Sequence, residues 1–405
     1  MQHVVLVAPY FSENMRHCVR CFAQLPDVTL GVLAQEHPDR VPEDLRALMP
    51  HYRQIGDPAH AANIVDGARA LQQEWGRLDR IEGYLEMLQV PIAEARDALD
   101  VDGMRAEAAA NCRDKNRMKD VLRKAGVPVA RQALVRGIDD VRAFVAEVGY
   151  PIVMKPLAGF GSRDTQRVHD DASLAVAMNL LLPSDAHPVQ AEEFVTGDEH
   201  TFEAVTLGGR TVWASSTAYL PRPLHVLENA WIQYAVVMSR ELLPPHAQAF
   251  AETNSKALAA LGVRDALSHM EWFLREDGTA VVSEVGARPP GANIMPLLAA
   301  AHGTDPWARW AELMVHRRWN MPERRFSAGT VFLRAMGGGE VVRAVEGADE
   351  LRARIGPMLH DVRLPRPGQP RSRHYEGDGW VIVRHPDDAQ VMAALGEVMR
   401  TLRVT

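Results

Sequence analysis

Short apolar runs alternate with amphipathic stretches over the first hundred residues. Residues 3–8 form a continuous apolar run, which is typical of a strand buried in a parallel sheet, and residues 15–25 follow with a helical pattern. Residues 28–33 predict a second strand, and residues 80–85 predict part of a later strand–helix unit. The pattern therefore predicts an N-terminal Rossmann-like α/β domain.

Two short motifs in this region bear on cofactors. The phosphate-binding fingerprint Gly-x-Gly-x-x-Gly is absent after the first strand, where Ala8-Pro9-Tyr10 stands, so dinucleotide binding at that place is unsupported. Cys18 and Cys21 have the C-x-x-C spacing of redox and zinc motifs, but no second cysteine pair accompanies them, and both fall on one face of the predicted helix. We interpret them as two small buried residues.

After residue 111 the pattern changes to a helix followed by strands. Residues 117–125 are helical and end at Gly126, which suits a helix C-terminus ahead of Pro128. Further predicted elements are strands at 151–156, 189–195, 201–207 and 211–216, an irregular stretch at 219–236, a helix at 245–261, a hairpin of strands 269–275 and 280–285, and a C-terminal helix capped by Asp387.

Composition narrows the class of protein. The 405 residues carry 45 basic and 52 acidic side chains, and the formal net charge of −7 argues against a protein that coats nucleic acid. No apolar run approaches the roughly 18 residues of a membrane span, and the N-terminus lacks the basic segment of a signal peptide. Three cysteines are too few for a disulfide framework. We expect a cytoplasmic, multi-domain protein that binds neither membranes nor nucleic acid.

The chain has only five lysines against 40 arginines, so a retained lysine suggests a need for a compact point charge. Lys115 opens the predicted helix and Lys155 ends a predicted strand, and two lysines on separate elements can converge on a triphosphate. The loop after Lys155 carries Gly159, Gly161 and Ser162, which can offer backbone N–H groups and a hydroxyl to phosphates. Alone, such a loop is weak evidence.

The segment that follows carries an acidic run on a predicted strand edge. Residues from Glu192 to Val195 can present backbone donors and acceptors to an adenine, and Glu199 can accept hydrogen bonds from ribose hydroxyls. Taken alone, this run is better explained as a solvated strand face. A nucleotide site is favoured because this acidic run follows the two lysines and the glycine-bearing loop, and precedes the pair of glutamates described next.

Glu271 and Glu284 lie on the two arms of the predicted hairpin, each flanked by apolar residues. Burying two carboxylates side by side is costly unless a cation lies between them, and Mg²⁺ with its preference for oxygen ligands is such a cation. Arg288, four residues after Glu284, can then direct its guanidinium at charge that develops during phosphoryl transfer.

These four features, in this order, resemble the ATP-grasp superfamily, in particular carboxylate–amine ligases related to bacterial L-amino-acid (dipeptide) ligases and to biotin carboxylase. The resemblance implies an α/β fold of the ATP-grasp type, in which a Rossmann-like domain precedes two subdomains that hold ATP between antiparallel sheets. It also implies ATP and Mg²⁺ (or Mn²⁺) as ligands. The implied roles are phosphate binding by Lys115, Lys155 and the loop with Gly159, Gly161 and Ser162, adenine binding through the Glu192, Glu193 and Val195 segment, ribose binding by Glu199, metal binding by Glu271 and Glu284, and stabilisation of an acyl phosphate by Arg288.

The resemblance covers most of the chain and suggests its division. We expect a Rossmann-like domain at 1–107, the two ATP-grasp subdomains at 108–190 and 191–326, and a C-terminal subdomain at 327–405. One position departs from the family pattern, because Gly286 stands where many members carry an asparagine that binds metal. A water or a phosphate oxygen can replace that ligand, and glycine can admit substrate or simply serve a turn.

The implied activity is the ATP-dependent joining of a carboxylic acid, which we expect to be an amino acid, to an amine, with release of ADP and phosphate. His225, Glu228 and Asn293 are candidates for contacts with these small-molecule substrates, although the first two are also well explained as surface polar residues. We expect a homodimer. Two alternatives remain: an ATP-grasp carboxylase that activates bicarbonate, and an ATP-binding regulatory module without catalysis.

Overall fold

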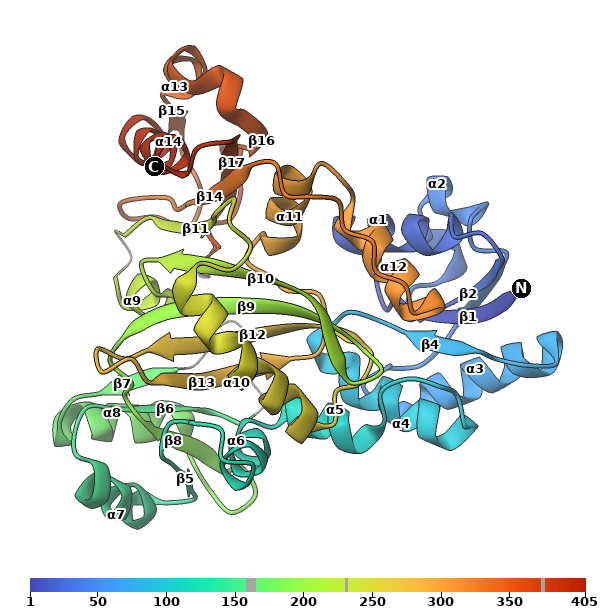
Figure 1. The fold of residues 1–405 in the computed structure, drawn as a ribbon, viewed down its shortest axis with the longest axis horizontal. Coiled ribbons are helices and arrows are strands. Elements are labelled where there is room, and N and C mark those ends of the chain that lie inside the picture. Colours follow the sequence, from blue (N-terminus) through green and yellow to red (C-terminus); the bar gives the residue numbers. More distant parts are fainter. Residues whose placement is uncertain (158–164, 230–231, 373–375) are drawn as a thin grey trace.

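The computed structural model describes residues 1–157, 165–229, 232–372 and 376–405. Within these ranges the chain forms three main sheets with helices packed on them, and a short two-stranded ribbon (Figure 1). Gly159, Gly161 and Ser162, predicted to bind phosphate, lie outside the described residues.

The N-terminal domain is built on a parallel sheet in the order β3-β2-β1-β4, which confirms the Rossmann-like prediction. Because side chains alternate along a strand, Val4 and Leu6 of β1 pack with the first helix, whereas Val5 and Val7 pack with the helices on the other face. The elements are β1 (Gln2–Val7), α1 (Glu13–Ala23), β2 (Val28–Ala34), η1 (Pro38–Arg40), α2 (Glu43–Arg46), β3 (His51–Gln54), α3 (Ala61–Trp75), β4 (Arg80–Glu82), η2 (Glu86–Leu88) and α4 (Gln89–Leu99).

A small antiparallel sheet follows in the order β5-β8-β6-β7, and two helices cover one of its faces. Ile152 and Met154 of β6 are buried beneath those helices, so Val153 and Lys155 face the opposite side. The elements are β5 (Gln132–Val135), α7 (Ile138–Val148), β6 (Ile152–Pro156), β7 (Gln166–Val168), α8 (Asp171–Leu181) and β8 (Val189–Glu193).

The largest sheet is antiparallel and runs in the order β13-β12-β9-β10-β11-β14-β17-β16. It continues past residue 326, where we expected a domain boundary, because β14 pairs with β11. The division into domains therefore stays a prediction. The strands are β9 (Asp198–Leu207), β10 (Arg210–Leu220), β11 (Tyr234–Met238), β12 (Ala266–Leu274), β13 (Ala280–Gly286), β14 (Ser327–Leu333), β16 (Leu359–Arg363) and β17 (Gly379–His385).

Helices cover both faces of the large sheet. On one face Phe250 of α10 stacks on Trp272 of β12, with ring centroids 4.1 Å apart. Helices α11 and α12 pack on the other face and join its core to that of α1. The remaining elements are α5 (Ala106–Arg113), α6 (Lys115–Lys124), α9 (Pro223–Glu228), α10 (Pro245–Leu261), α11 (Ile294–His302), α12 (Pro306–His316), β15 (Val345–Glu346), α13 (Ala348–Ile355), η3 (Gly356–Met358), α14 (Asp388–Thr401) and β18 (Arg403–Val404).

Most predicted elements are confirmed, and one is wrong. The helix expected at 245–261 has the bounds of α10, and Asp387 caps α14 as expected. The stretch 219–236, predicted as irregular, instead contains the end of β10, the helix α9 and the start of β11. Each of these pieces is short and Pro221 and Pro223 interrupt the pattern, so no window is long enough to display a period.

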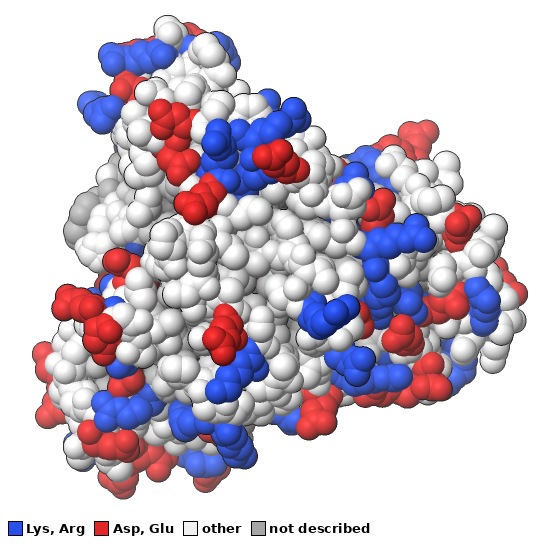
Figure 2. All heavy atoms as spheres, viewed as in Figure 1, with Lys and Arg blue, Asp and Glu red and all other residues white. Residues whose placement is uncertain are grey.

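The surface agrees with the composition. On the face shown in Figure 2, basic and acidic side chains are intermingled, and no broad basic stripe of the kind that binds nucleic acid crosses that face. No helix among the described residues is long and apolar enough to cross a membrane.

Candidate nucleotide and metal site

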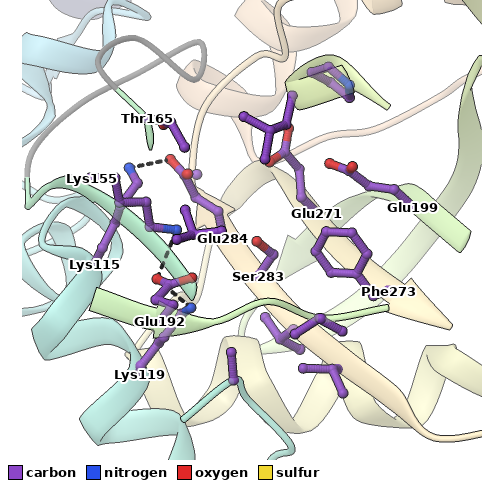
Figure 3. A pocket seen from close by; sticks show the side chains of 18 of the residues that line it. Lys115, Lys119, Lys155, Thr165, Glu192, Glu199, Glu271, Phe273, Ser283 and Glu284 are labelled. Carbon is purple, nitrogen blue, oxygen red and sulfur yellow. Dashed lines mark hydrogen bonds and ion pairs between the residues drawn. The ribbon is translucent and has the colours of Figure 1, made fainter. Parts of the chain in front are cut away.

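A pocket opens between the small sheet and the large sheet (Figure 3). Strands β6 and β8 supply one wall, β9, β12 and β13 supply the other, and α6 contributes lysines. The structure thus brings together most of the residues singled out from the sequence, across 174 positions of the chain. Those that line the pocket are Lys115, Lys155, Glu192, Glu193, Val195, Glu199, Glu271, Glu284 and Arg288.

Three lysines, rather than the two expected, gather on one side of the pocket. Asp114 caps α6 by accepting a hydrogen bond from the Arg117 backbone N–H, which fixes where the helix begins. Lys115 and Lys119 are four residues apart and so share the helix face that meets the pocket. Lys119 was missed in the sequence, although its place among only five lysines and its spacing from Lys115 were available signals.

Glu192 holds two of these lysines. Its Oε1 lies 2.6 Å from Lys119 Nζ and 2.8 Å from Lys155 Nζ, and all three side chains are largely buried. Burial opposes ionisation of Glu192, but the two lysines outweigh it and lower its pKa to about 2. Burial lowers the pKa of Lys119 to about 8, whereas for Lys155 the surrounding carboxylates outweigh burial and raise the pKa. The side chain of Glu192 therefore anchors lysines within the pocket.

The predicted metal pair meets across the β12–β13 hairpin, where Glu271 and Glu284 are cross-strand partners. The register shifts between Glu271 and Trp272, so that Trp272 pairs with Val282 and Ser283 is the extra residue of a bulge. Without that bulge Glu271 would face Ser283, and Glu284 would turn to the opposite face of the sheet. The bulge is what directs both carboxylates into the pocket.

Both carboxylates are half-buried and already have polar partners. Glu284 Oε1 lies 2.9 Å from Lys115 Nζ, and the Tyr219 hydroxyl donates to Glu271 Oε1 at 3.2 Å. Burial opposes ionisation of Glu284, but Lys115 and Lys155 outweigh it and lower its pKa. An ionised carboxylate with a free face is a suitable ligand for a hard divalent cation.

A buried histidine lies behind this pair and was not recognised in the sequence. His269 Nδ1 is 3.0 Å from Glu203 Oε1, and its Nε2 is 3.8 Å from Glu271 Oε1. Burial opposes its charge, but the hydrogen bond to Glu203 and the nearby charge of Glu271 outweigh burial and raise the pKa of His269 to about 9. His269 thus places a positive charge beside Glu271.

Part of the pocket lining is suited to a nucleoside. It consists of apolar side chains, namely Ala130, Val153, Val195, Phe273, Val281 and Val282. Glu199 lies beside Glu271 and near Phe273 (Figure 3), and burial together with the Glu271 charge raises the pKa of Glu199 to about 8. The side chain of Glu193 is not turned to a ligand, because it pairs with Arg131 and Arg275. Only its backbone remains for the adenine contact that we expected.

Arg288 lines the pocket and also pairs with the N-terminal domain. Its Nε donates to Glu86 Oε2, and its Nη1 donates to the Pro289 carbonyl at 2.8 Å. Arg113 Nε lies 3.7 Å from the other oxygen of Glu86. Glu86, which the sequence analysis missed, thus orients an arginine that lies 202 positions further along the chain.

The three candidate substrate residues do not line the pocket. His225 and Glu228 lie on α9, where Asn229 contacts the His225 ring and Arg167 Nη1 is 3.6 Å from Glu228 Oε2. Asn293 begins α11 and donates to the Thr330 hydroxyl at 3.4 Å. Among the described side chains of α9, Pro223 and Leu224 reach the lining. A role for the three in substrate binding stays a prediction.

Gly286 lies at the end of β13 and lines the pocket beside Arg288. A Cβ built there would approach Arg288 Cγ and Glu86 Oε2 no closer than 3.8 Å, which is ordinary contact, and its φ is not among the positive values. Neither a turn nor steric crowding therefore requires glycine at this position. Its absence of a side chain leaves room beside the carboxylate pair.

Comparison with protein families agrees with this geometry. Residues 120–300 match the family model of the ATP-grasp domain. A crystal structure of L-amino acid ligase from Bacillus licheniformis has the same fold, with a TM-score of 0.74 at 18% sequence identity over 100% of this chain and 98% of that one. The fold and the domain match together confirm the expected resemblance.

Relatives in sequence include ligases. The chain is 26% identical over 248 residues to alanine–anticapsin ligase of Bacillus subtilis (strain 168), an alignment that covers 56% of this chain and 52% of that protein. It is 30% identical over 238 residues to D-alanine–D-alanine ligase of Sodalis glossinidius, covering 56% of this chain and 61% of the relative. The aligned part thus spans little more than half the length of these relatives.

Proposed function

We propose that this chain, which carries an ATP-grasp domain, is an ATP-dependent and ADP-forming ligase that joins a carboxylic acid to an amine. The observation that carries the proposal is the pocket between the two sheets, whose lining combines three lysines, a pair of carboxylates and a group of apolar side chains. A nucleotide has the matching sequence of groups: an apolar base, a ribose, and phosphates with their cation.

Each part of the pocket has a proposed task. The apolar side chains that include Phe273 accept the adenine, and the Glu199 carboxyl exchanges hydrogen bonds with the ribose hydroxyls. Lys115 and Lys155 bind the phosphates as point charges. In the absence of nucleotide these two lysines pair with Glu284 and Glu192, so phosphate binding replaces or shares those ion pairs.

The donor set fits magnesium. Glu271 and Glu284 offer carboxylate oxygens from adjacent strands, and the described residues that line the pocket include no cysteine or methionine. The imidazole of His269 lies 3.8 Å from Glu271, but the carboxylates around it raise its pKa to about 9, which favours the protonated form that does not bind a metal. These two residues would hold the cation, with water and phosphate oxygens in the remaining positions, including the one that Gly286 leaves without a side chain. When bound, Mg²⁺ neutralises phosphate charge and orients the β and γ oxygens.

The reaction that we propose has two displacements. A carboxylate oxygen of the acid attacks the γ-phosphorus, the bond from that phosphorus to ADP breaks, and an acyl phosphate forms. The amine nitrogen then attacks the acyl carbon, the bond to phosphate breaks, and the nitrogen loses a proton. Arg288, positioned by Glu86 at the pocket wall, stabilises the charge on the transferring oxygens in both steps.

The names of the relatives support an amino acid as the acid, since alanine–anticapsin ligase and D-alanine–D-alanine ligase both name one. The test is release of ADP and phosphate by the purified chain across a matrix of amino acids and amines, with mass spectrometry of the products. We expect turnover to require both an acid and an amine, and the product mass to equal their sum less one water.

A matched control variant makes the assay specific. Glu276, exposed at the tip of the β12–β13 hairpin, can be changed to Gln without touching the pocket, whereas Glu284→Gln alters the pocket itself. Turnover that falls in the Glu284 variant and not in the Glu276 variant would trace the activity to this pocket, whereas equal turnover in both variants would count against the proposed site. Stimulation by bicarbonate without an amine would identify a carboxylase instead, and no stimulation by any pair would favour a regulatory nucleotide-binding module. The expected homodimer is a separate prediction.

A further inference from the structure

A second cluster of metal-ligating side chains lies outside the nucleotide pocket, where the N-terminal domain meets α12. His17 and Cys21 lie on α1, and Asp305 is the residue that caps α12. Because they are four residues apart, His17 and Cys21 share one helix face. The two cysteines of the C-x-x-C motif therefore have different surroundings. Cys18 is fully buried in the apolar core, whereas the Cys21 thiol lies beside His17 and Asp305.

The three ligand atoms are already close to one another. His17 Nε2 is 2.8 Å from Asp305 Oδ2, Cys21 Sγ is 3.4 Å from the same oxygen, and Cys21 Sγ is 3.7 Å from His17 Nε2. Around a tetrahedral Zn²⁺ ion, with bonds of the usual length, such atoms lie about 3.4 to 3.6 Å apart. A small opening between His17 and Asp305 would therefore suffice for an ion to enter.

Asp305 has one oxygen available for this role. Its Oδ1 accepts the hydrogen bond from the Trp307 backbone N–H that caps α12, at 2.9 Å, so the residue is held in place while Oδ2 points to the cluster. The side chains of His17 and Asp305 are 45% and 38% exposed, so an ion has a path from solvent.

We propose that His17, Cys21 and Asp305 bind a borderline-soft divalent cation of the Zn²⁺ class, with solvent as the fourth ligand. A thiolate and an imidazole select such ions over Mg²⁺, which favours oxygen ligands. The site would join α1 to α12, two elements nearly 300 positions apart in sequence, and so clamp the N-terminal domain to the large sheet. Binding replaces the proton of the Cys21 thiol, so the affinity for the cation should fall as the pH falls.

The test is a titration of the full-length, metal-stripped chain with Co²⁺, which reports a cysteine ligand through a thiolate-to-metal charge-transfer band. Excess Mg²⁺ is present throughout, to occupy the carboxylate pair of the nucleotide pocket. We expect one Co²⁺ per chain with that band, and displacement of the band by Zn²⁺. Cys21→Ser should abolish the band, and His17→Asn should weaken Co²⁺ binding at least ~10-fold.

Two control variants separate this site from other thiols. Cys18→Ala removes the other cysteine of the motif, and Cys112→Ala removes the only cysteine outside it; both should keep the band. His17 is half-exposed, so its variant is expected to fold even if the Cys21 variant does not. Absence of the band from the wild-type chain, or its persistence in both the His17 and the Cys21 variants, would overturn the proposal. So would its loss in the Cys112 variant.

Discussion

At the scale of single residues, the pocket depends on one carboxylate that two lysines share. Glu192 contacts both Lys119 and Lys155 through the same oxygen. A buried carboxylate keeps its charge only while cations compensate it, and here two do so. Because Lys119 also compensates the charge of Glu192, the ion pair between Glu192 and Lys155 can weaken when Lys155 binds a phosphate. Glu192, which we predicted to contact adenine through its backbone, thus also affects through its side chain how strongly Lys155 binds phosphate.

We expect Lys155→Ala to weaken ATP binding by at least ~10-fold and to reduce turnover to near background, because a direct phosphate partner is removed. Calorimetry gives the dissociation constant of ATP, and phosphate release gives the rate. Lys124→Ala, an exposed lysine at the end of α6, is the matched control and should behave as the wild type. ATP affinity and rate that both match this control would remove Lys155 from the site.

Lys119→Met tests the shared carboxylate. The change leaves Glu192 with Lys155 as its remaining lysine, so Lys155 should stay with Glu192 and ATP affinity should fall. Removing one partner of a buried charge should also lower the free energy of unfolding by about 1–3 kcal/mol. The double variant Lys119→Met with Glu192→Gln should recover ATP affinity in part, because the competing charge is gone. Equal ATP affinity in all of these variants, measured by calorimetry, would show that Lys119 has only a structural role.

At the scale of elements, the β12–β13 hairpin shows where inference from sequence succeeds and where it stops. The turn residues and the flanking apolar positions predict the hairpin and put Glu271 and Glu284 on its two arms. They do not predict the bulge at Ser283, which brings both carboxylates to one face. A bulge depends on how a strand pairs with and twists against its neighbours. The alternation of apolar and polar residues along one strand does not indicate where such an extra residue lies. Glu271 and Glu284 both line the pocket because this irregularity exists.

The same limit applies to β10, α9 and β11. Their boundaries follow from pairing with β9 and β14, strands that lie far away in sequence. By contrast α10 is long, periodic and closed by Gly262, so the sequence alone predicts both of its ends. Long elements with local start and stop signals are predictable, and short elements held by distant partners are not.

We expect Glu284→Gln to reduce turnover at least ~10²-fold and to raise the Mg²⁺ concentration needed for half-maximal rate, because the amide keeps the volume and loses the negative charge of a ligand. Turnover is measured over a range of Mg²⁺ concentrations at saturating ATP. Glu276→Gln, from the same hairpin, controls for a general loss of charge. A Mg²⁺ dependence identical in both variants would exclude Glu284 as a ligand.

At the scale of the whole molecule, a residue outside the pocket positions one of the side chains that line it. The N-terminal domain supplies Glu86, which orients Arg288 at the wall of the pocket. This contact joins residues 202 positions apart, so no motif or spacing could have revealed it. The arginine itself was identified from its place after Glu284, whereas its partner required the assembled fold. Domain placement is therefore part of the catalytic geometry that we propose.

Arg288→Lys keeps the positive charge but loses the planar fork that donates at once to Glu86 and to the Pro289 carbonyl. We expect kcat to fall steeply, while the dissociation constant of ATP stays within a few-fold, because the residue acts on charge that develops during the reaction. Phosphate release and calorimetry on one preparation give both quantities. If Arg288 is only an ion-pair partner of Glu86, the change should cost less than ~1 kcal/mol of stability and leave kcat unaltered.

The most direct test of the account is to follow one oxygen atom. An acid labelled with ¹⁸O in its carboxylate is incubated with ATP, Mg²⁺ and the amine that supports turnover, and the released phosphate is analysed by mass spectrometry. Because the carboxylate oxygen attacks the γ-phosphorus and leaves with it, we predict one ¹⁸O atom in each phosphate, together with ADP. Phosphate without the label, or AMP with the label, would contradict ligation through an acyl phosphate.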